Sequence, residues 1–432
     1  MDNFIEFISF QNPTLQIIAI GIFFLSVSSA MVGCFSFLRK QSLIGDAVAH
    51  GVLPGICLSF LLFENKNIYV LLWGASLTAW LSIATIQFVY SRSKIDKDTS
   101  MGIILSVFFG FGIVLLTIIQ GKSASAQAGL DKFIFGKAAS MIDTDVITIV
   151  IISLLVIATI ILLYKNLVIV SFDENFAKTI GLKVELFKFI LTMMTVLVIV
   201  IGIQSVGIVL ISALLITPPV TARFWTNKLS LMIFIACIFS ILSGFGGTYI
   251  SYTYENMPTG PWIVVFMSIF AFISFAVAPK KGFISKLYRD FLNRRKIEDE
   301  NILKTMYALM EDSTNNNTNN ATYSLKNILK KRNQNPIKAR NTINRLCNQG
   351  FISKNNINEN LELTPQGLEK GKRITRLHRL WELYLTKNLH LTPSHVHEDA
   401  ETIEHIITPE LEERIIKELG YPTTDPHNKN IP

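Results

Sequence analysis

The chain has 432 residues, of which 50% are hydrophobic and only 17% charged, and its formal net charge is +8. The apolar residues are concentrated before residue 280 in runs of the roughly 20 residues needed to cross a bilayer, which excludes a wholly water-soluble protein. The positive charge alone does not indicate nucleic-acid binding, because membrane proteins use Lys and Arg to fix their orientation. The scattered cysteines, with no Cys-x-x-Cys spacing, exclude a disulfide framework and a zinc finger.

The hydropathy pattern predicts an all-α polytopic membrane protein with about nine transmembrane helices. The expected spans are residues 14–38, 42–63, 68–91, 100–119, 145–164, 184–203, 206–222, 229–250 and 259–279. Lys and Arg gather in alternate loops, which predicts a cytoplasmic C-terminus and an N-terminus outside a bacterial plasma membrane. The basic segment 120–144 is the exception, because it falls outside, and we expect a short interfacial helix within it.

Ionisable side chains are nearly absent from these spans, and Asp46 and His50 are the exceptions. Such groups are costly in hydrocarbon, so they usually face a protein-lined cavity and mark an ion or proton path. Their i, i+4 spacing places both on one helix face. A carboxylate and an imidazole together suit Mn²⁺, Fe²⁺ or Zn²⁺. A hydrogen bond that pins two helices and a proton relay are the alternatives.

The loop "VSFDENFAKTIGL", residues 170–182, mixes apolar and charged side chains in the manner of a short amphipathic helix. Gly181 is expected to end this helix. The pattern leaves open whether the helix lies on the membrane surface or docks into a soluble partner. The candidate coupling residues are Phe172, Asp173, Glu174, Ala177 and Gly181.

The composition changes abruptly after Lys281, which predicts a soluble domain beyond the membrane region. We divide the chain into a transmembrane domain at 1–281, a linker helix and winged helix-turn-helix at 282–380, and a helical metal-binding and dimerisation region at 381–432. The Asn/Thr-rich stretch 311–322 is expected to be a loop, since it cannot bury apolar surface.

The helix-turn-helix region is strongly basic. Residues 324–380 hold 13 Lys and Arg against 3 Asp and Glu, whereas residues 381–432 hold 4 against 10. This charge favours DNA binding through the second helix, although contact with a protein or with anionic lipid remains an equal alternative. The DNA-binding candidates are Lys338, Arg340, Asn341, Asn344 and Arg345.

The acidic region contains a cluster of His and Glu. His378 and Glu382 are spaced i, i+4, and a second segment carries His397, Glu401, Glu404 and His405. Clustered imidazoles and carboxylates on neighbouring segments can chelate a divalent cation. A solvated acidic helix that contains histidine by chance is the alternative.

Four segments of the membrane region carry a family resemblance: "MVGCFSFLRKQSLIGDAVAHGVLPG", "FDENFAKTIGL", "SVGIVLISALLITPPVTAR" and "MPTGPWIVV". They resemble, in order and spacing, the membrane subunit of ABC-type manganese, zinc and iron importers. The resemblance implies a homodimeric permease with Asp46 and His50 on the metal path. It also implies a cytosolic ATPase that grips the loop 170–182 and an extracytoplasmic metal-binding protein. The chain has no Gly-x-x-x-x-Gly-Lys-[Ser/Thr] motif, so ATP hydrolysis is expected on another subunit.

The segments "TPQGLEKGKRITRLHRLWELYL", "VHEDAETIEHIITPELEERI" and "GYPTTDPHNKNIP" resemble the diphtheria-toxin-repressor family of metal-dependent regulators. This resemblance implies regulatory metal ligands at His378, Glu401, Glu404 and His405, and an ancillary site at Glu382 and His397. A glutamate at position 401 favours manganese or zinc over iron. Asn301 and Lys304 stand where manganese-type members have acidic ligands, which should weaken the site.

The sequence therefore predicts the permease subunit of an ABC importer of Mn²⁺, Zn²⁺ or Fe²⁺ with a fused repressor-like domain that regulates transport or binds DNA. A membrane-tethered transcriptional regulator, held at the membrane or freed by proteolysis, is one alternative. A proton-coupled secondary transporter, which would need no ATPase partner, is the other.

Overall fold

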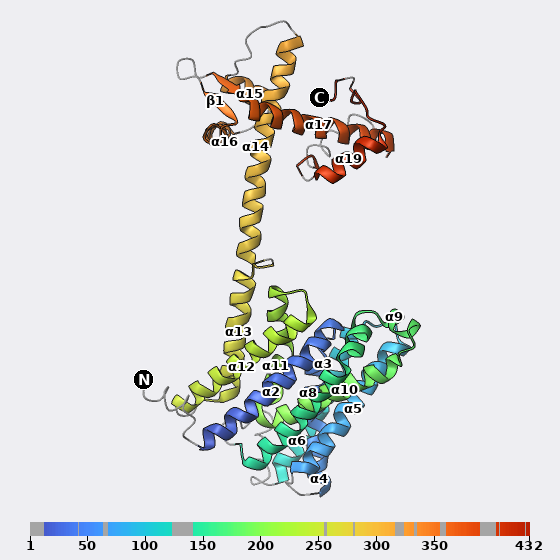
Figure 1. Ribbon diagram of the computed structural model, residues 1–432. Coiled ribbons are helices and arrows are strands. Elements are labelled where there is room, and N and C mark those ends of the chain that lie inside the picture. Colours follow the sequence, from blue (N-terminus) through green and yellow to red (C-terminus); the bar gives the residue numbers. More distant parts are fainter. Residues whose placement is uncertain are drawn as a thin grey trace. The chain divides into compact units, whose positions relative to one another are not determined.

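The computed structural model describes residues 13–41, 43–63, 68–122, 141–254, 257–279, 281–315, 324–331, 335–354, 360–388, 403–405, 407–427 and 429–432. The chain divides into two compact units, Met1–Lys286 and Leu287–Pro432 (Figure 1). The interfacial helix expected within 120–144, at "LDKFIFGKAAS" (residues 130–140), lies outside the described residues.

The regular secondary structure of the first unit is all helical over its described residues. Its helices are α2 (Pro13–Leu38), α3 (Ile44–Gly51), α4 (Leu53–Phe63), α5 (Ile68–Arg92), α6 (Lys97–Lys122), α8 (Asp143–Phe172), α9 (Glu174–Thr179), α10 (Val184–Val206), α11 (Ile208–Trp225), α12 (Leu229–Thr253) and α13 (Thr259–Val277). Among the described residues, eight helical segments are long and apolar enough to cross a membrane, and α11 contains a shorter apolar helix. The predicted all-α polytopic fold is confirmed.

Helices α3 and α4 form one span, Ile44–Phe63, that is interrupted at Val52. Pro54 contributes to the interruption, because it has no backbone N–H to donate to the carbonyl of His50, four residues earlier. Helix α3 packs against α5, α6, α10 and α11. The segment that carries Asp46 and His50 is therefore surrounded by other helices of the membrane unit.

The second unit contains a winged helix-turn-helix. Its helices are α14 (Phe283–Asn315), which begins four residues before the unit boundary, α15 (Leu325–Lys331), α16 (Pro336–Asn348), α17 (Pro365–Asn388) and α19 (Pro409–Glu418). Strands β1 (Ile352–Lys354) and β2 (Leu361–Leu363) form an antiparallel pair in which Ile352 is opposite Leu363. The Asn335 side chain caps α16 by accepting a hydrogen bond from the Ile337 N–H at 3.0 Å.

Two apolar clusters hold this unit together. The larger one joins α14, α15, α16 and the strands through Leu303, Met306, Ile328, Leu346 and Ile352. The smaller one joins α17 and α19. Helix α17 continues across residue 380, so the winged helix and the acidic region share one helix. Helix α14 continues to Asn315, which makes the first residues of the Asn/Thr-rich stretch helical rather than a loop.

Candidate functional site

Asp46 and His50 lie on α3 and are both partly exposed within the membrane unit. The His50 ring lies edge-on to Phe109 of α6, with 4.7 Å between the ring centroids. Its Nδ1 atom is buried and has no hydrogen-bond partner among the described residues. The imidazole thus rests against an aromatic ring and keeps an unbonded nitrogen, which is a metal-binding atom when neutral.

The coupling residues form a short helix, α9, that is firmly attached to the membrane unit. The Asp173 carboxylate caps it by accepting hydrogen bonds from the N–H groups of Asn175 and Phe176, both at 3.0 Å. Glu174 forms an ion pair with Lys188 of α10 at 2.7 Å. Ala177 is fully buried. Gly181 lies just after the end of α9 and turns the backbone there with a φ of +82°, which glycine adopts at little cost.

Two aromatic side chains of the same loop are exposed. Phe172 is 61% exposed and Phe176 is 54% exposed. A charged cavity of about 480 Å³ lies on the attached side, and its lining includes Arg39, Lys97, Glu174, Glu185 and Lys188. An anchored helix with exposed aromatic side chains is suited to contact with another protein or with lipid.

The DNA-binding candidates lie on α16, and four of them share its exposed side. Lys338, Arg340, Asn341 and Asn344 are exposed, while the opposite side of the helix is buried. Arg345 instead turns toward α14, where its Nη2 and Nε atoms donate to the Asp299 carboxylate at 2.7 and 3.0 Å. Arg345 therefore holds the helix-turn-helix to α14.

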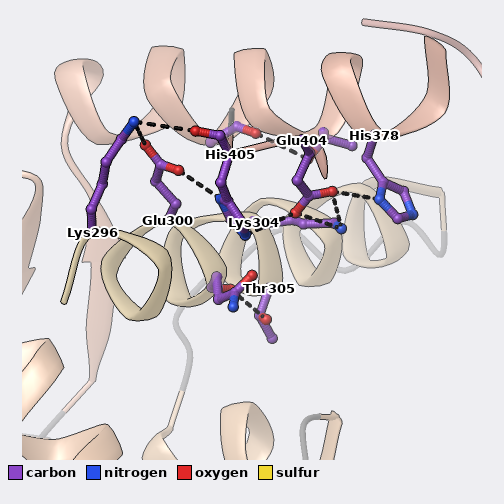
Figure 2. A network of polar contacts seen from close by, with 10 residues as sticks. Lys296, Glu300, Lys304, Thr305, His378, Glu404 and His405 are labelled. Atoms are coloured by element: carbon purple, nitrogen blue, oxygen red, sulfur yellow. Dashed lines mark hydrogen bonds and ion pairs between the residues drawn. The ribbon is translucent and has the colours of Figure 1, made fainter. Parts of the chain in front are cut away.

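In the acidic region, His378 and Glu404 lie in direct contact. The Glu404 Oε2 atom is 2.5 Å from Nδ1 of His378, and Nε2 of His378 is 3.0 Å from the Glu382 carboxylate. The Lys304 ammonium donates to both oxygens of Glu404, at 3.0 and 2.8 Å. Figure 2 shows Lys304 of α14 reaching the Glu404 carboxylate beside the His378 ring.

His405 belongs to the same network through a second acidic residue of α14. Its Nδ1 atom is 2.6 Å from the Glu300 carboxylate, and its Nε2 atom is 3.6 Å from Glu404 (Figure 2). Lys296 donates to the backbone carbonyl of His405 at 3.3 Å and lies 3.8 Å from Glu300. One face of α14 thus binds both residues of the 404–405 pair.

The pKa shifts follow from these contacts. Burial alone would lower the pKa of His378, but its hydrogen bonds with Glu382 and Glu404 raise it above the usual value. Burial would likewise raise the pKa of Glu404, but the contacts with His378 and Lys304 hold it below the usual range. Both shifts favour the charged forms, an imidazolium and a carboxylate.

The described part of this cluster does not fit a metal ion. No group of three or more His, Cys, Asp and Glu side chains within it converges on a common centre. A divalent ion on Glu404 would lie close to the Lys304 ammonium, and two positive charges at that separation repel strongly in a buried site. The predicted ligands Glu401 and His397 lie outside the described residues.

Sequence reasoning missed the contact of Glu300 with His405 and the role of Lys304 as a partner of Glu404. Lys296, Glu300 and Lys304 are spaced at i, i+4 and i+8, which places them on one helix face. That spacing, with its alternating charge, was the sequence feature that could have indicated a polar contact on this face of α14. The spacing could not identify the partners of Glu300 and Lys304, because these partners lie about a hundred residues away in the sequence.

Known proteins resemble both parts of the chain. The ABC 3 transport family matches residues 11–278, and the iron dependent repressor, metal binding and dimerisation domain matches residues 364–432. The chain is 38% identical over 381 residues to the manganese transport system membrane protein MntC of Bacillus subtilis, covering 88% of this chain and 86% of that protein.

It is also 40% identical over 280 residues to the zinc transport system membrane protein TroC of Treponema pallidum, covering 65% of this chain and 94% of that protein. Among solved structures, PsaBC from Streptococcus pneumoniae in complex with Fab is similar over 66% of this chain and 99% of that chain, with 35% identity and a TM-score of 0.58. Both resemblances drawn from the sequence are confirmed. The chain belongs to the ABC 3 transport family and carries a repressor-like domain at its C-terminal end.

Proposed function

We propose that the chain is the membrane permease subunit of an ATP-driven importer of a divalent transition metal, with Asp46 and His50 on the ion path. The observation that carries this proposal is the buried, unbonded Nδ1 of His50 one helical turn from Asp46, on a helix surrounded by other spans. The names of the relatives, which are manganese and zinc transport proteins, support this cargo class.

The pair suits transient binding. One carboxylate and one imidazole leave most of the coordination shell of the ion to water, so the ion is held weakly enough to move on. A complete cage of four or more protein ligands would trap the ion instead. The aspartate charge compensates part of the cost of bringing a divalent cation into a low-dielectric region.

The test is metal uptake by cells that produce Asp46→Ala or His50→Ala chains. We expect uptake of radiolabelled Mn²⁺ or Zn²⁺ to fall at least tenfold at equal membrane levels of protein. The matched control is Asp143→Ala, at the exposed start of α8, which should leave uptake unchanged. Normal uptake by both path variants would contradict the assignment.

The physiological cargo is identified by elemental analysis of cells with and without the protein under Mn, Zn and Fe limitation. We expect a selective deficit of manganese or zinc in the cells that lack it. An equal content of all three metals would contradict import of a transition metal.

Membership of the family supports a set of partners. The permease acts as a homodimer in the membrane lipid, receives metal from an extracytoplasmic binding protein and is driven by a cytosolic ATPase that contacts α9. In this arrangement the N-terminus is outside and the second unit is cytoplasmic. The exposed Phe172 and Phe176 on a helix anchored by Asp173 and Lys188 support α9 as the ATPase contact.

Co-purification tests this partner. An ATP-binding subunit that remains with the permease supports the importer, whereas uptake that needs only a proton gradient and no ATPase supports the secondary transporter. A substitution of Phe176 by Asp should release the ATPase and leave the permease in the membrane, because a charge replaces an apolar contact.

A second candidate function is DNA binding by the cytosolic unit, and the exposed basic side of α16 favours it. We expect the full chain, in nanodiscs of neutral lipid, to bind DNA from its own promoter more tightly than unrelated DNA. Lys338→Ala with Arg340→Ala should weaken this binding at least tenfold, while Arg414→Ala, at an exposed position of α19, should not. Equal, salt-sensitive binding to any DNA would argue against a specific regulator.

A further inference from the structure

The Glu404 carboxylate is held by a cation that the chain itself supplies. The side chain of Glu404 is 0% exposed, and that of its partner Lys304 is 13% exposed. The ammonium contacts both carboxylate oxygens, at 3.0 and 2.8 Å, in a bidentate arrangement (Figure 2). A fully buried carboxylate needs such a partner, because an unpaired buried charge is strongly destabilising.

The other charged groups around Lys304 and Glu404 also contact partners of opposite charge or imidazole rings. Glu404 also contacts His378, and His378 contacts Glu382 at 3.0 Å. On the other side, Glu300 contacts His405 at 2.6 Å and lies near Lys296. Lys296, Glu300 and Lys304 alternate in charge along α14, and each carboxylate of the network contacts a Lys or His side chain of the same network.

We propose that the Lys304 ammonium replaces a metal ion in the cytosolic unit, so that α14 stays docked on the His378 and Glu404 face whether or not metal is present. This inference concerns the assembly of the cytosolic unit and does not depend on the proposed transport function. Its consequence is that the unit keeps one conformation at this face across the range of cellular metal levels.

The geometry at Glu404 favours the Lys304 ammonium over a bound divalent metal ion. A divalent cation that bound both oxygens of Glu404 would have to displace Lys304 from a largely buried position. The displaced ammonium would then remain near the ion because its side chain is attached to α14. Lys304 also links α14 to residue 404 across 100 positions of sequence, which is the kind of cross-link that a metal ion would otherwise provide.

Hydrogen exchange of the purified full chain in nanodiscs tests the proposal. Peptides from residues 296–310 and 370–388 should show the same protection in EDTA as in MnCl₂ or ZnCl₂. Lys304→Met removes the ammonium and leaves Glu404 without its cation, so protection of both peptides should fall at least tenfold. Lys304→Glu should also lose protection in EDTA and regain it with Mn²⁺ or Zn²⁺, because the ammonium is replaced by an oxygen ligand.

The matched control is Lys331→Met. Lys331 forms an ion pair with Asp312 in the same unit, but both side chains are substantially exposed. Exposed pairs contribute little to stability, so the control should keep wild-type protection. Wild-type protection that is lost in EDTA and restored by Mn²⁺ or Zn²⁺ would overturn the proposal, and so would undiminished protection in Lys304→Met. Neither result depends on whether the permease transports metal.

Discussion

Gly33 in α2 lies where the backbone of another helix approaches too closely for a side chain. A Cβ atom at this position would be 1.9 Å from the carbonyl oxygen of Leu215 in α11. Because the obstacle is backbone, it cannot move aside without shifting α11. We expect Gly33→Ala to destabilise the membrane unit by about 1–3 kcal/mol, the usual cost of overpacking a core.

Thermal unfolding in detergent measures this effect. The control is Gly110→Ala in α6, where nothing lies within 4 Å of the added Cβ. We expect a lower unfolding temperature for Gly33→Ala and an unchanged or slightly higher one for Gly110→Ala, because alanine favours the helix. Equal unfolding temperatures for the two variants would show that α2 and α11 do not approach as described.

At the scale of an element, α9 depends on its N-terminal cap. Asp173→Ala removes the acceptor of two backbone hydrogen bonds, which costs about 1 kcal/mol and lowers the population of the helical turn about fivefold. We expect metal uptake to fall by a similar factor at equal membrane levels. Asp173→Asn keeps a capping oxygen and should retain most of the uptake. Equal loss in both variants would indicate that the charge of Asp173, rather than the cap, is required.

At the scale of the whole molecule, the membrane unit has an apolar core of its own. The related TroC protein is matched over 94% of its length by 280 residues of this chain, so it has little room for a unit comparable to Leu287–Pro432. We expect a chain that ends at Lys286 to insert into the membrane and to retain metal uptake, measured against full-length protein at equal abundance. Loss of insertion would show that the second unit is needed for folding.

Sequence patterns predicted the features that depend on local spacing. Long apolar runs predicted the membrane spans, since a helix of about 20 apolar residues crosses the bilayer with its backbone hydrogen bonds made within the segment. The i, i+4 spacing of His378 and Glu382 correctly suggested a contact. In contrast, the pairing of Lys304 with Glu404 joins distant segments, so local spacing could not reveal it. Arg345 was predicted to face DNA, and its turn toward Asp299 depends on the placement of α14.

The continuity of α17 has a mechanical consequence for the second unit. Its 24 residues make a rod about 36 Å long that contacts β2 near one end and α19 near the other. Because α17 is one continuous helix, a tilt of the end that contacts α19 also moves the end that contacts the β1–β2 wing. The shared helix therefore couples movements at the two ends of the unit.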